Sequence, residues 1–346
     1  MLRRSKLKIW FDADNGPHVL IMRPLVAELT KRGHQVVFTA RDRTHTPELL
    51  DLYGFDYQKV GGEFGKGKLS KITGTLARAW SLRNTMAKNA PDVSFGHGSR
   101  SLPIASKLLG IPSVTMYDYE WVNATLFNWG CRNILIPEAV SLERCTEAGI
   151  SANRIIRYPG YKEELYLGSG DFDTSIADDL GLRDDSVRIL LRPPATTAHY
   201  HNPEAELILD SILKKIASIS NVQLVFLPRT PDQLELPERA GISEIIVPEK
   251  VYDGPSLVAT MDMVISGGGT MTREAAIMGV PSFSFFRGRS GMVDESLTAA
   301  GKLTVIGTSS EVDERLVVEK NQNDVTRPDS SSMVDFIAST IIAAAR

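Results

Sequence analysis

Short apolar runs rich in valine, isoleucine and phenylalanine alternate with longer stretches of helical periodicity along most of the chain. A first series comprises residues 7–11, 35–39, 92–95, 112–116 and 133–136. A second series comprises residues 187–191, 222–227, 245–247, 263–266, 281–285 and 303–306. Such alternation is typical of βα units that build a mostly parallel sheet covered by helices on both faces. The sequence therefore predicts two doubly wound α/β halves.

The stretch between the two series is polar and acidic. Residues 168–186 contain six aspartates and a single arginine. We therefore predict an N-terminal domain over residues 1–165 and a C-terminal domain over residues 166–330. Residues 331–346 are periodic and apolar and predict a closing helix. The length of 346 residues agrees with two domains, at about 150 residues for each.

The overall composition excludes several classes of protein. The 39 lysines and arginines against 42 aspartates and glutamates leave a net charge of −3, so we expect no nucleic-acid partner. There is no run of about 18 apolar residues and no secretory signal, which predicts a cytoplasmic protein. Cys131 and Cys145 are too few for a disulfide scaffold, and we expect reduced thiols in the core.

The strongest candidate site is the segment SGGGTMTREAAIMGVP at residues 266–281, which predicts a strand, a glycine turn and a helix. Three glycines let the backbone approach a ligand, and the N–H groups at a helix start bind anions such as a diphosphate. Glu274 is expected to stabilise the helix start or to accept hydrogen bonds from a ribose diol. The predicted ligand contacts come from Gly267, Gly268, Gly269, Thr270, Thr272 and Glu274. The segment matches neither a dinucleotide fingerprint nor a P-loop.

A second candidate site follows the first predicted strand, in the run DADNGPH. Asp14 and His18 lie where an open α/β sheet usually has its crevice, and His18 is a candidate general base because imidazole titrates near working pH. Alternatively, Asp14 or Asn15 caps the following helix and His18 packs against it. The pair formed by Asp12 and Asp14 also resembles the opening of haloacid-dehalogenase-like phosphatases, although no downstream GDxxxD motif is present.

Other predicted strands of the first half also end in polar residues. His97 and Arg100 occur in the run GHGSR and either contact an acceptor or a phosphate, or merely follow a glycine turn. Asp118 and Glu120 occur among aromatics in the run YDYEW. They suit acid/base catalysis or hydrogen bonding to a sugar, and aromatic packing beside solvated acids is the alternative.

In the second half, Arg192 and Arg229 follow predicted strands and are phosphate candidates by position. His199 and His201 form a His-x-His pair, but a metal site needs at least one further ligand, so no metal is predicted.

A basic amphipathic segment covers residues 64–90, with six cations, no acid and interleaved apolar side chains. Such a segment suits peripheral contact with an anionic membrane surface, or attraction of a polyprenyl-diphosphate acceptor. A solvated helix face over the core is the simpler interpretation.

Taken together, these motifs resemble the GT-B fold of nucleotide-sugar enzymes, in which two Rossmann-like domains face each other across a cleft. The closest resemblance is to a prokaryotic family of unknown function related to that fold. It is carried by residues 8–18, 32–34, 39–42 and 267–276.

Two enzyme families of the wider fold have similar segments. The N-acetylglucosaminyltransferase of peptidoglycan synthesis has a run similar to residues 273–281, which implies that Glu274 holds the ribose. The non-hydrolysing UDP-N-acetylglucosamine 2-epimerases have a similar Ser-Gly-Gly, Glu and Gly-Val-Pro run. They use carboxylates and a histidine to eliminate and re-add UDP, and the candidates for these roles are Asp118, Glu120 and His199.

Retaining GT-B transferases carry a second glutamate eight positions after the first, where this chain has Ser282. The resemblance therefore implies an inverting, metal-independent glycosyltransferase with His18 as base and a UDP-sugar as substrate, without a further cofactor. The acceptor would be a glycan or a lipid-linked molecule of cell-surface polysaccharide or glycoconjugate synthesis. A sugar-nucleotide 2-epimerase is the main alternative, followed by a phosphatase and a non-catalytic nucleotide-sugar-binding protein.

Overall fold

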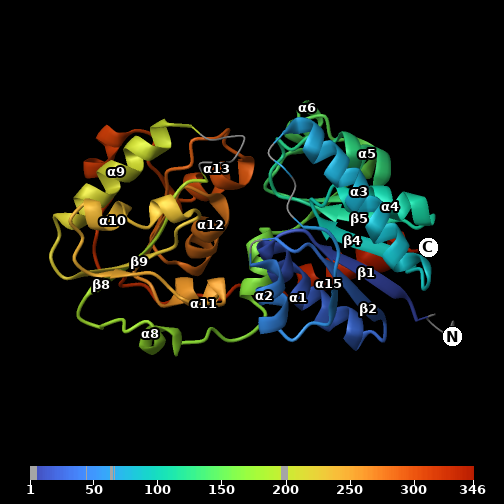
Figure 1. Cartoon of the computed structure of the whole chain (residues 1–346), viewed down its shortest axis with the longest axis horizontal. Helices are drawn as coiled ribbons and strands as arrows, with labels where there is room; N and C mark the ends of the chain where they lie inside the picture. Colours follow the sequence, from blue (N-terminus) through green and yellow to red (C-terminus); the bar gives the residue numbers. More distant parts are fainter. Residues whose placement is uncertain (1–5, 44, 63–64, 66, 196–201) are drawn as a thin grey trace. The chain divides into compact units, whose positions relative to one another are not determined.

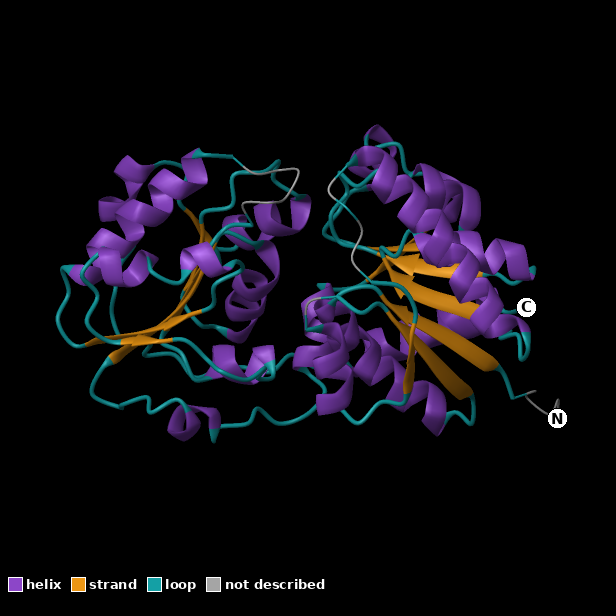
Figure 2. Cartoon of the chain, viewed as in Figure 1, coloured by secondary structure: helices purple, strands orange, loops and turns teal. Residues whose placement is uncertain are grey.

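The computed structural model in Figure 1 describes residues 6–43, 45–62, 65, 67–195 and 202–346. The chain divides into two compact units. The N-terminal unit comprises Met1–Ser169 together with Asp329–Arg346, and the C-terminal unit comprises Gly170–Pro328. In each unit a parallel sheet lies between helices, as Figure 2 shows, which confirms the predicted α/β class. No helix within the described ranges is long and apolar enough to span a membrane.

The N-terminal sheet has seven parallel strands in the order β3-β2-β1-β4-β5-β6-β7. Its strands are β1 Lys8–Ala13, β2 Gln35–Ala40, β3 Tyr57–Lys59, β4 Val93–His97, β5 Ser113–Met116, β6 Asn133–Pro137 and β7 Ile155–Tyr158. The order reverses direction between β1 and β4, so their carboxyl ends flank the usual ligand position of an open sheet. The five predicted strands are confirmed, and the two that the sequence pattern missed, β3 and β7, form the edges.

Eight α-helices of this unit are α1 Gly16–Lys31, α2 Thr46–Leu52, α3 Lys68–Ala87, α4 Ser101–Leu109, α5 Thr125–Gly130, α6 Leu142–Glu147, α7 Lys162–Leu167 and α15 Ser331–Ala344. Although α15 comes from the other end of the chain, it packs on α1 (Figure 1). The Arg32 side chain, at the end of α1, donates to Asp335 at 2.8 Å and to Ser339 at 2.9 Å.

The C-terminal sheet repeats the same topology with six strands, in the order β10-β9-β8-β11-β12-β13. Its strands are β8 Val187–Arg192, β9 Val222–Phe226, β10 Ile245–Ile246, β11 Met263–Ser266, β12 Ser282–Ser284 and β13 Thr304–Val305. Its α-helices are α8 Ile176–Asp179, α9 Glu204–Ala217, α10 Leu236–Arg239, α11 Gly254–Ala259, α12 Gly269–Met278, α13 Met292–Ala299 and α14 Val312–Arg315.

The central strands are covered on both faces and therefore read as almost continuous apolar runs. In β1, Phe11 packs against Phe38 and Phe95 with ring centroids 5.5 Å and 5.1 Å apart. Cys131 and Cys145 are free and buried, as predicted. Burial raises the pKa of the Cys131 thiol to about 12 and that of Cys145 to about 11, so both remain protonated at neutral pH.

One buried ion pair ties α3 to the middle of the N-terminal sheet. Asp12 on β1 is fully buried and Arg78 on α3 is 2% exposed. The guanidinium of Arg78 donates to both carboxylate oxygens, at 2.8 Å and 2.9 Å. The hydroxyls of Thr39 and Ser99 each donate to the same carboxylate at 2.7 Å. These four hydrogen bonds compensate for removing the carboxylate from water.

We expect Arg78→Met to destabilise the N-terminal unit by about 3–5 kcal/mol, because it leaves the Asp12 carboxylate buried without a counter-charge. Urea-induced unfolding followed by circular dichroism measures the loss. Lys88→Met, at the exposed end of the same helix, is the matched control and should change stability by about 0.5 kcal/mol or less. Equal losses in the two variants would contradict the anchoring role of Arg78.

Candidate functional site

Polar side chains from four strand ends gather at the carboxyl edge of the N-terminal sheet. His18 comes from the first turn of α1, directly after β1, and His97 is the last residue of β4. Asp118 follows β5, and Lys162 begins α7 shortly after β7. The carboxyl ends of neighbouring parallel strands meet at one edge, which explains why residues so distant in sequence meet here.

This cluster is closely packed. The rings of His18 and His97 lie with centroids 4.9 Å apart. Nε2 of His97 lies 3.5 Å from one oxygen of Asp118, and Nζ of Lys162 donates to the other oxygen at 2.6 Å. The structure thus brings together three residues that the sequence singled out separately, His18, His97 and Asp118.

The hydrogen bonding of His18 contradicts its predicted role as a base. Its Nδ1 accepts a hydrogen bond from the backbone N–H of Asp14 at 3.2 Å. Burial first, and then the neighbouring His97 and Lys162, lower the pKa of His18 well below its usual value. A neutral imidazole that accepts at Nδ1 carries its proton on Nε2. Nε2 of His18 is therefore a hydrogen-bond donor, which argues against His18 as the general base.

Asp14 lies between two guanidinium groups. Its carboxylate is 3.3 Å from Nη1 of Arg41 and 3.5 Å from Nη1 of Arg78. Burial raises the pKa of Asp14, the nearby carboxylate of Asp12 adds to the rise, and the two arginines oppose it. The cap of α1 is instead Asn15, whose side chain accepts from the N–H of Gly16 at 3.1 Å. A catalytic role for Asp14 stays a prediction.

Asp12 itself is not an exposed nucleophile. Both of its oxygens accept hydrogen bonds from Arg78, and the side chain is fully buried. In a haloacid-dehalogenase-like phosphatase, Asp12 or Asp14 would attack a phosphate from the end of the first strand. This hypothesis is wrong for Asp12.

Glu120 and Arg100 have surroundings that differ from those of the His18 cluster. Glu120 is 1% exposed, and one of its oxygens lies 3.6 Å from Nη1 of Arg144 on α6. Arg100 is exposed at the residue before α4. Their predicted roles as catalyst and ligand contact stay predictions.

Lys162 and Glu163 complete the cluster, and sequence reasoning missed both. Lys162 is 4% exposed and contacts one oxygen of Glu163 at 3.1 Å, in addition to Asp118. Glu163 is fully buried. The residues lie just before the predicted domain boundary at residue 165, after a short run that lacks the apolar pattern of a central strand. Recognition of the short run IIRY as a strand would have placed Lys162 at the carboxyl edge of the sheet.

In the C-terminal unit, the glycine turn between β11 and α12 is tightly packed. A Cβ atom on Gly267 would lie 2.8 Å from the backbone of Pro194. A Cβ on Gly268 would lie 2.6 Å from Nη2 of Arg229. Only glycine fits these two positions without displacing a neighbour. The N–H groups of residues 269–271 at the start of α12 lack partners in the helix and form a potential anion site.

Two arginines stand beside this turn. Nε of Arg229 donates to the carbonyl oxygen of Pro193 at 2.8 Å. Arg192 ends β8, and its Nη1 lies 3.6 Å from Sδ of Met271. The Nε–H of Arg192 is buried and has no hydrogen-bond partner among the described residues. Burial, followed by the charge of Arg229, lowers the pKa of Arg192 to about 10, so it remains cationic at neutral pH.

Thr272 does not serve the predicted role of anion ligand. Its side chain is fully buried, and its hydroxyl donates back to the helix, at 3.1 Å from the carbonyl of Gly268 and 2.9 Å from that of Gly269. Thr270, the second residue of α12, is only half-buried and remains a candidate. Ser282, eight positions after Glu274, donates to the carbonyl of Thr272 at 2.7 Å and supports the helix.

Glu274 is 2% exposed and is the sixth residue of α12, which is too far along the helix to stabilise its first turn. Its charge acts on Arg192. A Cβ on Gly254, the first residue of α11, would lie 4.0 Å from the Glu274 carboxylate. The Glu274 carboxylate therefore lies between Arg192 and the first residue of α11.

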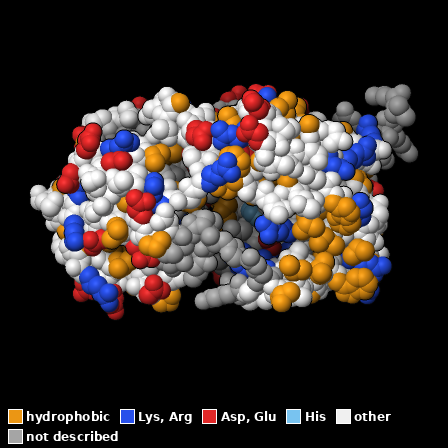
Figure 3. All heavy atoms as spheres, turned by 90° about the horizontal axis from the view of Figure 1, so that it is seen from above, with side chains coloured by type: hydrophobic (Ala, Val, Ile, Leu, Met, Phe, Trp, Pro, Cys, Tyr) orange, Lys and Arg blue, Asp and Glu red, His pale blue; other side chains and the backbone are white. Residues whose placement is uncertain are grey.

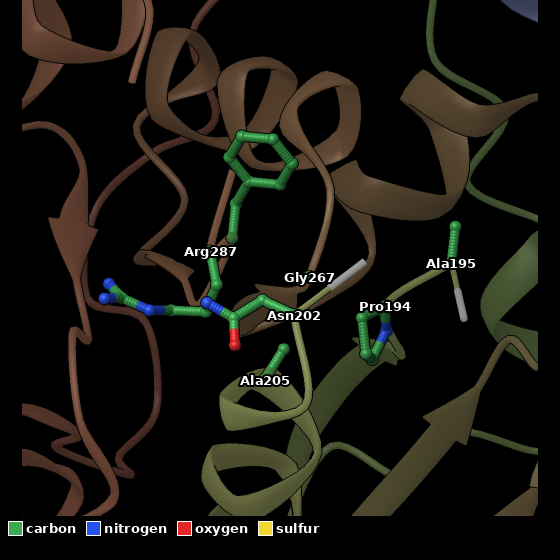
Figure 4. A pocket seen from close by; sticks show the side chains of 7 residues that line it. Pro194, Ala195, Asn202, Ala205, Gly267 and Arg287 are labelled. Atoms are coloured by element: carbon green, nitrogen blue, oxygen red, sulfur yellow. The ribbon is translucent and has the colours of Figure 1, made fainter. Parts of the chain in front are cut away.

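A small pocket opens beside Gly267, and Figure 4 shows the side chains around it. Its lining consists of Pro194, Ala195, Asn202, Ala205, Gly267, Phe286 and Arg287. Arg287 is held by Glu204, with Nε 3.1 Å from the carboxylate. His199, which the epimerase resemblance singled out, and His201 lie outside the described residues.

A family model described as "Protein of unknown function (DUF354)" matches residues 7–344. The chain belongs to this family. The DUF354 chain is also 29% identical over 287 residues to "Uncharacterized protein MJ0665" of Methanocaldococcus jannaschii. The aligned region covers 81% of this chain and 82% of that protein.

Solved structures with a similar fold share little sequence with this DUF354 chain. A UDP-GlcNAc 2-epimerase from Neisseria meningitidis bound to UDP-GlcNAc has a TM-score of 0.74 and 16% identity, over 97% of this chain and 100% of that one. S. aureus MnaA with UDP has a TM-score of 0.68 and 17% identity, over 89% and 88%. Anabaena Alr3699/HepE with UDP and glucose has a TM-score of 0.58 and 16% identity, over 98% and 97%. The DUF354 chain therefore has the predicted GT-B-like fold.

The protonation of His18 predicts a loss of stability in mild acid. The unfolded histidine has a pKa of about 6.5, whereas the folded one lies well below it, so only the unfolded chain takes up this proton as the pH falls below about 6.5. Stability should be complete above that pH and decrease below it by up to about 1.4 kcal/mol per pH unit.

Urea unfolding between about pH 7.5 and pH 5.5 tests this dependence. His18→Asn, whose amide oxygen can replace Nδ1 as acceptor, should lose less stability on acidification than the wild type. His45→Asn removes an exposed histidine and should behave as the wild type. If His18→Asn kept the full acid sensitivity, another group would be responsible.

Proposed function

We propose that this protein is a nucleotide-sugar enzyme whose C-terminal unit binds the diphosphate of a UDP-sugar at the start of α12. The observation that carries the proposal is the buried Nε–H of Arg192, which has no hydrogen-bond partner among the described residues. Its guanidinium contacts Met271 in the first turn of α12, where the N–H groups of a helix have no partners within the helix. A buried cationic donor without a partner is costly, and an anionic ligand would satisfy it.

The surrounding residues fit the other parts of such a ligand. Gly267 and Gly268 let Pro194 and the Arg229 guanidinium pack closely against the turn, which brings a cation to the start of α12. Arg229 supplies a second cation near Gly268, and Thr270 a hydroxyl near the helix start. The buried carboxylate of Glu274 is the candidate acceptor for the ribose hydroxyls. UDP is chosen over other nucleotides because the similar solved structures are described with UDP or UDP-GlcNAc.

We propose sugar transfer with inversion as the reaction. A base removes the hydroxyl proton of the acceptor, the acceptor oxygen bonds to the anomeric carbon, and the bond from that carbon to the diphosphate breaks. The N–H groups of α12 and the two arginines stabilise the charge on the departing UDP. The acceptor is proposed to be a glycan or a lipid-linked molecule.

The base is proposed to be His97, oriented by Asp118, instead of His18. Asp118 lies 3.5 Å from Nε2 of His97 and is held by Lys162 at 2.6 Å. A carboxylate beside one imidazole nitrogen holds the ring in a fixed orientation, in which the other nitrogen can face the hydroxyl of an acceptor. His18, which carries its proton on Nε2, would donate a hydrogen bond to the bound sugar or acceptor.

Epimerisation at C2 of a UDP-sugar is the second candidate, favoured by the similarity in fold to UDP-GlcNAc 2-epimerases. This reaction removes the proton on C2 and eliminates UDP from C1. UDP then adds back to C1 while a proton is delivered to C2 on the opposite face, which inverts C2. Asp118, with Glu120, would then handle protons on the sugar itself. The two reactions share the nucleotide site and differ in their need for an acceptor.

Thermal unfolding with and without UDP and UDP-GlcNAc tests the nucleotide site. A ligand at 100 times its Kd should add about 2.7 kcal/mol to the stability of the native state and raise the Tm. Arg192→Met should abolish the rise, and Glu274→Ala should reduce it for UDP. Arg239→Met, an exposed arginine of the same unit, is the control and should keep it. A Tm rise that survives Arg192→Met would refute the site, as would the absence of any rise with UDP, GDP, CMP or dTDP sugars.

Proton NMR of UDP-GlcNAc incubated with the enzyme separates the two reactions. Transfer should consume the substrate only when an acceptor is added, whereas epimerisation should yield a second UDP-sugar without one. His97→Asn or Asp118→Asn should lower the rate by about 10²–10⁴-fold while leaving the UDP-induced Tm rise intact. Binding without turnover under either condition would instead indicate a sugar-nucleotide sensor.

A further inference from the structure

Helix α3 carries an exposed apolar stripe that nothing in the proposed reaction uses. Leu69 is 79% exposed, Ile72 58%, Leu76 53% and Trp80 57%. Their spacings of three, four and four residues place them along one side of the helix. We call these four residues the α3 stripe. The stripe spans eleven residue steps, or about 16 Å of helix.

The opposite side of α3 is fixed to the protein. Ala79, Leu82 and Met86 are buried in a core cluster that includes Trp10 and Leu102, and Arg78 is paired with Asp12. The helix therefore carries apolar side chains on two sides. One side packs in the core, and the other, the α3 stripe, is exposed. Because the core residues of α3 are already buried on its inner side, the exposed stripe is not part of the core.

The charge on the segment that carries the stripe has a single sign. Residues 64–90 contain six cations and no acid. Arg78 is paired with Asp12 inside the protein and does not add charge to the surface. The other described cations of the segment include Lys71, Arg83 and Lys88. The guanidinium of Arg83 lies over the ring of Trp80, 5.6 Å from its centroid. Figure 3 shows hydrophobic and cationic side chains next to one another on the right-hand unit, which is the N-terminal unit.

We propose that the α3 stripe docks the protein on the surface of an anionic lipid bilayer. The leucines and isoleucine would enter the boundary between headgroups and acyl chains, and the cations would contact anionic headgroups. Trp80 with Arg83 suits the interface itself, where an aromatic ring and a cation meet both apolar and wet surroundings. This inference is independent of the proposed nucleotide site.

A second copy of the chain fits this surface less well. In a symmetric dimer the same patch appears on both subunits. Pairing two α3 stripes would bring the cations of both copies together, and segment 64–90 offers no acid to neutralise them. Anionic lipids complement both the apolar and the cationic character of the stripe.

Co-sedimentation of the full chain with vesicles tests the proposal. We expect binding to vesicles of phosphatidylcholine mixed with phosphatidylglycerol, and at least about tenfold weaker binding to pure phosphatidylcholine. Raising the salt concentration from about 0.1 M to about 1 M shortens the Debye length from about 10 Å to about 3 Å and should weaken the binding. Ile72→Ser/Leu76→Ser and, separately, Leu76→Glu should each reduce partitioning about tenfold or more. Exposed positions tolerate such changes, and circular dichroism verifies the fold.

Leu207→Glu is the matched control, because Leu207 on α9 is 63% exposed and lies outside the basic segment. It should partition as the wild type does. Equal partitioning of the Leu76→Glu variant, or no sedimentation with anionic vesicles, would overturn the proposal. A dimer seen by analytical ultracentrifugation and abolished by Leu76→Glu would also overturn it, by assigning the stripe to a second copy. UDP-induced Tm shifts report on the nucleotide site separately, so failure of one proposal does not imply failure of the other.

Discussion

The ion pair between Asp12 and Arg78 is the contact on which the N-terminal unit depends. It joins β1 to α3, and the hydroxyls of Thr39 and Ser99 extend it to β2 and to the turn after β4. Arg78 also donates from Nε to the carbonyl of Val60 at 2.9 Å. A single carboxylate thus fixes the carboxyl edge of the sheet, where His18 and His97 lie, and at the same time fixes which side of α3 faces outward. The candidate catalytic cluster and the α3 stripe have a common support.

The central strands could be predicted because burial on both faces demands continuous apolar runs. The edge strands could not. Tyr57–Lys59 is largely exposed, and Ile155–Tyr158 is buried fully only at its last residue, so neither carries the pattern of a central strand. The omission had a functional cost: because β7 was not expected, Lys162 and Glu163, which follow it, were not among the candidate site residues.

The proximity of candidate residues could be predicted where topology alone determines position. Because the ends of parallel strands converge, His18, His97 and Asp118 lie together although they are up to 100 residues apart. Topology could not give the direction of individual hydrogen bonds. The acceptor role of Nδ1 in His18 and the inward hydroxyl of Thr272 depend on backbone geometry that residue types do not encode. The same holds for Ser282. A serine in place of the second glutamate of retaining transferases favours an inverting reaction, but the sequence does not show that its hydroxyl donates to α12 and supports that helix.

The return of α15 to α1 makes the two units unequal in how they can assemble. The C-terminal unit is one continuous segment, whereas the N-terminal unit is interrupted by it. The contact between Arg32 and Ser339 joins residues 307 positions apart, so it closes a loop that contains the entire other unit. Closing so long a loop costs more chain entropy than any contact within the C-terminal sheet. We therefore expect the C-terminal unit to fold as an insert of its own, and α15 to dock on the N-terminal unit only after the intervening chain has become compact.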